Sequence, residues 1–170
     1  MDKAKKEILK RQKEWGGDSK VLVKRMKAPK QAGMFATRTI KKGETIAYYP
    51  IVLIADPGPD TKDPLRNYFI EVRFRGRQNE LVGKPDLTIV ARKPTRAIAY
   101  TALWANEPYP SQTANAEMVG RELTRQPSIG DKIKYSLKAT TNIREGDEVM
   151  WCYGTEFDRG SPPYETGCPE

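Results

Sequence analysis

The chain contains no histidine among its 170 residues, which excludes several common kinds of active site. A Ser-His-Asp triad, a Cys-His pair and a histidine-ligated zinc all require the imidazole ring. The two cysteines, Cys152 and Cys168, are too few for a four-cysteine zinc site, so no metal is expected. The phosphate-binding motifs GxxxxGK[ST] and GxGxxG are also absent. An enzyme built from this chain would have to use tyrosine, asparagine, carboxylates or backbone groups.

Long hydrophobic runs are missing as well. The longest, residues 97–105, is far shorter than the roughly 20 residues that span a bilayer, and no signal-peptide core precedes it. We therefore expect no membrane partner. With two cysteines, one of them near the chain end, we expect ordinary thiols in a reducing, intracellular compartment, nuclear or cytoplasmic. The chain is long enough to bury a core without a disulfide or a metal.

Acidic residues are outnumbered by basic ones, 22 against 30, which gives a formal net charge of +8. The excess lies mainly in the first 42 residues and around residues 73–77. A positive field favours anionic partners, so nucleic acid or a nucleosome is one candidate partner. A surface that merely keeps the protein soluble explains the charge equally well.

Helix signals are few, and the sequence predicts a mainly β protein. A basic helix is predicted within residues 1–18, and a second helix is predicted from Thr95 to residue 105. Alternating or short apolar runs predict strands at 19–26, 67–75, 81–82, 87–90 and 131–141. We expect one domain over residues 19–157 with an insert at 56–94, followed by a proline-rich lid or tail at 158–170.

One turn pattern occurs twice, as TIKKGETI at 39–46 and as NIREGDEV at 142–149. Gly43 and Gly146 can supply the positive φ that such turns require. Each turn leads into an apolar segment that ends near a tyrosine. In the second segment Val149, Trp151 and Tyr153 would share one face of a strand. Because the intervening sequence has no period, the two turns suggest strands that meet in space and not a tandem repeat.

Three further segments share an order along the chain: QAGMFA at 31–36, NEPYPSQTANA at 106–116 and EGDEVMWCYG at 145–154. The first is expected to form a glycine turn at 32–35. Together the three resemble the signature of SET-domain protein lysine methyltransferases, whose elements are GxG-hydrophobic-Phe-Ala, Asn-His-Ser-Cys…Pro-Asn-Ala and Gly-Glu-Glu-Leu-x-Phe-Asp-Tyr-Gly. The resemblance covers about residues 20–157. It implies a SET-type β-clip fold of small curled sheets. In this fold the asparagine loop (residues 106–116) and the terminal strand (within residues 145–154) are threaded into a C-terminal pseudoknot.

The resemblance also implies an activity, the transfer of a methyl group from S-adenosylmethionine to a lysine of a protein substrate, with a histone tail as one candidate. Tyr153 stands at the family's catalytic tyrosine position, and Asn115 would pin the threaded loop. The implied cofactor-binding residues are Ala32, Gly33, Met34, Asn106 and Glu107. The candidates for the substrate channel are Trp151, Tyr49, Trp104 and Tyr164.

The chain departs from the family pattern at five positions: Gln31 for the first glycine, Glu107 for histidine, Pro108 for serine, Trp151 for Phe or Tyr, and Cys152 for aspartate. Trp151 would either narrow the pocket towards monomethylation or turn into the core. The alternative function is a non-catalytic binding module on the same or a related β-clip fold, in which these departures record a lost site.

Overall fold

The computed structural model describes residues 6, 10, 19–27, 32–74, 77–90, 92, 98–120, 123, 125–154 and 165–169, with the backbone alone at 73 and 77–79. Most of the predicted N-terminal helix lies outside these residues, although Lys6 and Lys10 are helical and exposed. Gln31 and Tyr164 also lie outside them. No helix in the described part of the chain is long and apolar enough to cross a membrane.

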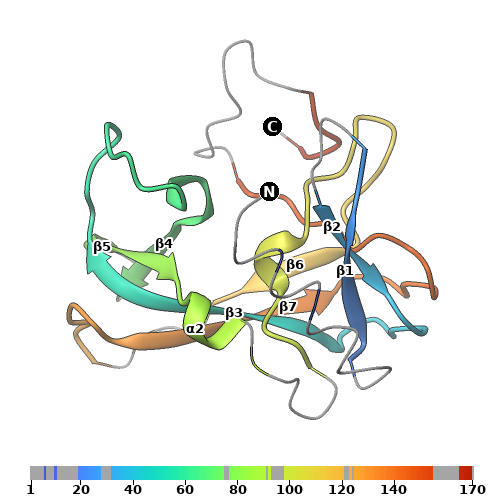
Figure 1. The fold of residues 1–170 in the computed structure, drawn as a ribbon, viewed down its shortest axis with the longest axis horizontal. Coiled ribbons are helices and arrows are strands. Elements are labelled where there is room, and N and C mark those ends of the chain that lie inside the picture. The colour runs from blue at the N-terminus through green and yellow to red at the C-terminus, as the bar shows by residue number, and fades with distance from the viewer. Residues whose placement is uncertain are drawn as a thin grey trace.

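Two antiparallel sheets make up the fold, so the prediction of a mainly β protein is confirmed (Figure 1). The first pairs β1 (Val21–Arg25) with β2 (Ala32–Ala36). The second has the order β4-β5-β3-β7-β6, with strands Ile70–Phe74, Arg77–Pro85, Thr45–Ala55, Lys132–Ala139 and Ala116–Val119 respectively. The described helical pieces are short: η2 (Arg66–Tyr68), α2 (Leu87–Val90) and η3 (Ala102–Trp104).

The long strands β3 and β7 run across the molecule from β4 and β5 towards β1 and β2 (Figure 1). Alternation predicted β7 well, because Tyr135, Leu137 and Ala139 are buried while the residues between them are more exposed. The strand predicted at 67–75 is observed as β4, in which Val72 is buried. The predicted strand at 19–26 is confirmed as β1, and the strand predicted at 81–82 is part of β5.

Two predicted elements are wrong. Residues 87–90 form α2 and not a strand, because Asp86 accepts hydrogen bonds from the Thr88 amide at 3.1 Å and the Thr88 hydroxyl at 2.6 Å. The helix predicted from Thr95 to residue 105 is reduced, in its described part, to the single turn η3. The reason is a tertiary contact: Ala99 bridges Ala47 in parallel, and its carbonyl accepts the Tyr48 amide at 2.8 Å.

The two similar turns do meet in space, as the repeated pattern predicted. Ile40 and Ile143 exchange two backbone hydrogen bonds, each 2.9 Å long. The turn glycines have φ values of 85° at Gly43 and 87° at Gly146. Each turn glycine also donates its amide to a residue that precedes the other turn. Gly43 donates to the Ala139 carbonyl at 2.8 Å, and Gly146 donates to the Ala36 carbonyl at 2.9 Å. These hydrogen bonds place the second turn beside the first and beside the end of β2.

The first turn carries an ion pair that makes stability depend on pH. Lys20 donates to Glu44 Oε2 at 2.7 Å, and Glu44 Oε1 accepts the Lys41 amide at 3.1 Å. The hydrogen bond from Lys20, followed by that from Lys41, lowers the pKa of Glu44 below its ordinary value. A lowered folded-state pKa gives stability that is present above the ordinary glutamate pKa of about 4.3 and lost as the pH falls through the folded pKa.

We expect Glu44→Gln to lower the free energy of unfolding by about 0.2 to 1 kcal/mol at neutral pH, since the pair is partly exposed. The difference from the wild type should shrink as the pH falls below about 4. Urea unfolding at several pH values measures this. Lys20→Met should show the same pH dependence, and an equal difference at pH 7 and pH 3 would contradict the assignment.

Candidate functional site

The segment 148–151 is threaded between two parts of the asparagine loop. On one side Met150 forms a parallel bridge with Asn106, and the Trp151 amide donates to the Asn106 carbonyl at 3.0 Å. On the other side the amides of Asn115 and Ala116 donate to the Met150 carbonyl at 3.1 and 3.0 Å. This threading is the C-terminal pseudoknot that the sequence predicted. The segment makes isolated bridges, however, and not the regular strand expected through Tyr153.

Asn115 fastens the threaded segment with its side chain. Its Nδ2 donates to the Glu148 carbonyl at 2.8 Å, and its Oδ1 accepts the Met150 amide at 2.9 Å. One amide group therefore satisfies a donor and an acceptor two residues apart on the same extended backbone. The predicted role of Asn115 as the pin of the loop is confirmed.

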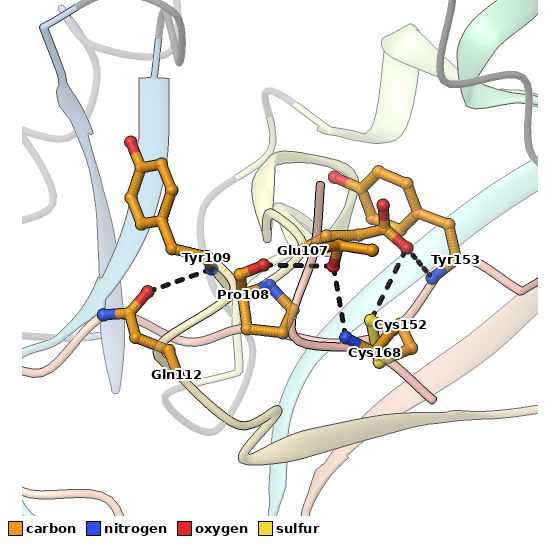
Figure 2. The surroundings of a disulfide bond; sticks show 8 residues. Glu107, Pro108, Tyr109, Gln112, Cys152, Tyr153 and Cys168 are labelled. Atoms are coloured by element: carbon orange, nitrogen blue, oxygen red, sulfur yellow. Dashed lines mark hydrogen bonds between the residues drawn. A yellow bond between two sulfur atoms is a disulfide. The ribbon is translucent and has the colours of Figure 1, made fainter. Parts of the chain in front are cut away.

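Tyr153, the candidate catalytic residue, is held at both its ends. Its hydroxyl donates to the Ala105 carbonyl at 2.9 Å. Its amide donates to Glu107 Oε1 at 2.9 Å, as Figure 2 shows. Its ring packs edge-on against Trp151, with centroids 5.1 Å apart and planes at 60°. Such a T-shaped pair is a favourable arrangement for two aromatic rings.

Tyr49 is the second tyrosine of the site and reaches it from β3. It is buried, and its hydroxyl donates to the Tyr68 carbonyl at 2.6 Å. Burial, and then the neighbouring tyrosines Tyr153 and Tyr68, raises the pKa of Tyr49 well above its ordinary value. Tyr49 therefore stays protonated at neutral pH, and its hydroxyl remains a donor to the Tyr68 carbonyl.

The two candidate tryptophans differ in their surroundings. Trp104 is 4% exposed and belongs to the core, one residue before Ala105, whereas Trp151 is half-buried, packs against the core and contacts Tyr153. The indole N–H of each is buried with no acceptor among the residues that the structure describes.

Gly33 lies in strand β2, opposite Lys24, so the glycine turn expected at 32–35 is wrong. The physical reason for glycine here is close approach and not a positive φ. A Cβ at position 33 would lie 2.5 Å from Met26 Sδ, 2.9 Å from Glu148 Oε1 and 3.1 Å from Asn106 Nδ2. Three segments of the chain therefore converge over one backbone position.

Asn106 links these segments by hydrogen bonds. Its Nδ2 donates to the Ala32 carbonyl at 2.9 Å and to Glu148 Oε1 at 2.8 Å. The neighbouring Met34 is fully buried, and its sulfur accepts the Thr101 hydroxyl at 3.5 Å. The predicted group of Ala32, Gly33, Met34 and Asn106 is thus brought together, whereas the carboxylate of Glu107 is turned to the Tyr153 amide.

Sequence reasoning missed three contributors to the site. Glu148 carries the carboxylate beside Gly33, and its signal was available, because alternation places it on the face opposite Val149. Met26 had no signal, because it follows β1 in an irregular stretch. The Ala105 carbonyl had none either, since a backbone acceptor leaves no trace in the residue type.

Cys152 and Cys168 form a disulfide, so the expectation of two ordinary thiols is wrong (Figure 2). The cysteines are 16 residues apart in sequence, and their Cα atoms are 5.7 Å apart. Residue spacing alone does not reveal such a pair, because it depends on where the tail returns to the site. No group of three or more His, Cys, Asp or Glu side chains suited to a metal gathers within the described part of the chain.

The fold and site together define a β-clip arrangement of the SET type. No family model and no curated protein matches the sequence. Among solved structures, the chain is similar to a Plasmodium falciparum protein, a proposed histone methyltransferase, with a TM-score of 0.53 and 19% identity. The match covers 82% of this chain and 96% of the other. The likeness shows that the chain has a methyltransferase-like fold.

Proposed function

We propose that the protein is a protein-lysine N-methyltransferase that transfers a methyl group from S-adenosylmethionine to a lysine side chain. The observation that carries the proposal is the 2.9 Å contact of the Tyr153 hydroxyl with the Ala105 carbonyl, on a tyrosine whose ring packs against Trp151. Two oxygens next to an aromatic wall suit a site that positions an amine and a polarised methyl group.

The residues around Gly33 fit the amino-acid end of this cofactor. The Glu148 carboxylate and the Ala32 carbonyl are acceptors for an ammonium group, and the Asn106 amide is a donor for a carboxylate. The atoms nearest Gly33 are the ends of flexible side chains, which can rearrange around a ligand while the backbone stays in place. When bound, S-adenosylmethionine supplies a methyl group carried on a positively charged sulfonium.

The chain's own residues would then orient the substrate and exclude water. Tyr153 and Ala105 present oxygen atoms that can hold an amine N–H or a polarised C–H group. The rings of Tyr49 and Trp151 would desolvate the lysine amine, which lowers its pKa and favours the neutral nucleophile. Positioning of the reactants is the main contribution that such a site can make.

Trp151 bears on the number of methyl groups transferred. Its ring packs on the core and also lies against the ring of Tyr153, and tryptophan is bulkier than the Phe or Tyr usual at this position. We therefore propose monomethyl-lysine as the product. The substrate class we propose is a basic protein tail such as that of a histone, because the structural neighbour is a proposed histone methyltransferase. The +8 charge would hold the enzyme near nucleic acid on which such a tail lies.

Calorimetry with S-adenosylmethionine, followed by incubation with labelled cofactor and a mixed histone and lysate substrate set, tests the proposal. We expect saturable one-to-one binding and label on lysine, with a product mass that corresponds to one methyl group. Gly33→Ala should weaken binding, whereas Gly120→Ala, whose added Cβ meets only ordinary contacts at 3.4 Å or more, should not. No binding at millimolar cofactor would contradict the proposal and favour the non-catalytic module.

A further inference from the structure

The end of the chain docks on the loop that carries Glu107. The Gly167 amide and the Thr166 hydroxyl both donate to the Pro108 carbonyl, at 3.1 and 3.0 Å. A Cβ on Gly167 would lie 1.9 Å from the Gln112 carbonyl oxygen and 2.6 Å from that of Tyr109. Both are backbone atoms of a turn closed by a hydrogen bond, so the docked position accepts only glycine.

The same tail segment is bonded covalently to the residue before Tyr153. The disulfide joins Cys168 to Cys152, and both cysteines are half-buried. Residues 165–169 are therefore held at two points, by hydrogen bonds to Pro108 and by the bond to Cys152. Figure 2 shows Glu107, Tyr153 and both cysteines gathered around these attachments.

Glu107 lies between the disulfide and Tyr153. The residue is 4% exposed, and its Oε1 accepts the Tyr153 amide at 2.9 Å while it lies 3.6 Å from Cys168 Sγ. A disulfide sulfur carries no proton, so in the oxidised pair this oxygen serves Tyr153 without competition from sulfur. A Cys168 thiol at this place would be an S–H donor aimed at the same oxygen.

We propose that the Cys152–Cys168 disulfide and Glu107 form a reducible clasp that positions the backbone of Tyr153 and holds the C-terminal segment on the 107–112 loop. Glu107 is a positioning residue in this clasp, since it acts through the Tyr153 amide. The effect of the clasp on methyl transfer rests on the proposed function, whereas its effect on the docking of the segment does not.

Opening the clasp requires a dithiol as the reductant. A thiolate of the dithiol attacks one sulfur, the S–S bond breaks through a mixed disulfide, and the second thiol of the dithiol displaces the other cysteine. The two cysteines gain two electrons and two protons, and the dithiol becomes a disulfide. In a reducing compartment the clasp would be open, and in an oxidising one it would be closed.

Hydrogen exchange of the full chain, with and without dithiothreitol, tests the clasp without reference to activity. We expect a linked Cys152–Cys168 peptide before reduction and two alkylated cysteines after it. Exchange of the Tyr153 amide and of residues 165–169 should rise about tenfold or more on reduction, while amides of β3 and β7 stay protected. Alkylation of both cysteines without reductant, or unchanged exchange after reduction, would overturn the proposal.

Substitutions at Gly167 and at Glu107 separate the clasp from a general loss of structure. Gly167→Ala should loosen residues 165–169 with the disulfide intact, whereas Gly120→Ala should not. Glu107→Ala should speed exchange of the Tyr153 amide, and Glu107→Gln should restore its protection, because the glutamine oxygen still accepts the amide. Equal exchange in both Glu107 variants would remove Glu107 from the clasp.

The effect on activity is measured last. Reduction should lower kcat about tenfold with a smaller change in the KM for cofactor, and reoxidation with oxidised glutathione should restore it. A protein that binds no cofactor but shows the redox-dependent exchange would contradict the proposed function alone. An active protein whose kcat and exchange are both insensitive to dithiothreitol would contradict the clasp alone.

Discussion

Tyr153→Phe is expected to lower kcat by about 100-fold or more while the affinity for S-adenosylmethionine changes by less than about threefold. The substitution removes one oxygen atom, the hydroxyl that contacts the Ala105 carbonyl at 2.9 Å. The ring and its packing against Trp151 remain, and so does the hydrogen bond from the Tyr153 backbone amide to Glu107. The loss should therefore fall on the orientation of the reacting groups and not on the cofactor pocket.

Single-turnover transfer of labelled methyl and calorimetric titration measure the two quantities separately. The matched control is Tyr48→Phe, which removes a hydroxyl from a tyrosine whose ring lies under Lys134, with the Lys134 Nζ 4.0 Å from the ring centroid. The control should keep wild-type rates. The free energy of unfolding of Tyr153→Phe should fall by only about 1 kcal/mol, the usual net value of one hydrogen bond. Transfer by Tyr153→Phe at the wild-type rate would remove Tyr153 from its role.

Asn115→Ala is expected to lower the free energy of unfolding by about 2 to 4 kcal/mol, because it removes two hydrogen bonds to the backbone of the threaded segment. The Glu148 carbonyl loses its donor and the Met150 amide loses its acceptor. Both groups lie where the segment passes through the loop, so water can replace the lost amide only by entering the pseudoknot. Urea unfolding at neutral pH, followed by far-UV circular dichroism, measures the change.

Asn142→Ala is the control, since its Oδ1 accepts the Lys42 amide at 2.9 Å in an exposed turn, and it should cost about 1 kcal/mol or less. Asn115→Asp retains an acceptor for Met150 and loses the donor for Glu148, so its stability should lie between the wild type and Asn115→Ala. Equal effects of the alanine substitutions at 115 and 142 would show that the threaded segment does not depend on Asn115.

Much of the candidate site could be predicted because its residues stand in short sequence motifs that follow one another in a fixed order. The asparagines at 106 and 115 and the tyrosine at 153 stand in short motifs, and the structure brings all three to the threaded segment. Tyr49, a channel candidate implied by the resemblance, is buried and donates its hydroxyl to the Tyr68 carbonyl. The roles predicted for these side chains in binding and catalysis stay predictions.

Other parts could not be predicted because a partner from elsewhere in the chain decides them. Residues 98–105 carry a helical pattern, yet Ala99 pairs with β3. Gly33 was expected in a turn because glycine favours turns, whereas here it admits Met26, Glu148 and Asn106 to its backbone. In each case a non-local contact outweighs a local propensity, which amounts to only about 1 kcal/mol per residue.

The sequence by itself determined the features that arise from single residues and short periods: turns at Gly43 and Gly146, alternating burial along β7, and the mainly β class. Only the tertiary structure decided that Cys152 forms a disulfide with Cys168 and that the Glu107 carboxylate accepts the Tyr153 amide. Backbone geometry and hydrophobic alternation act within a few residues and can be read from the chain. Pairing between distant segments depends on the closure of long loops, and residue type alone does not encode which segments meet.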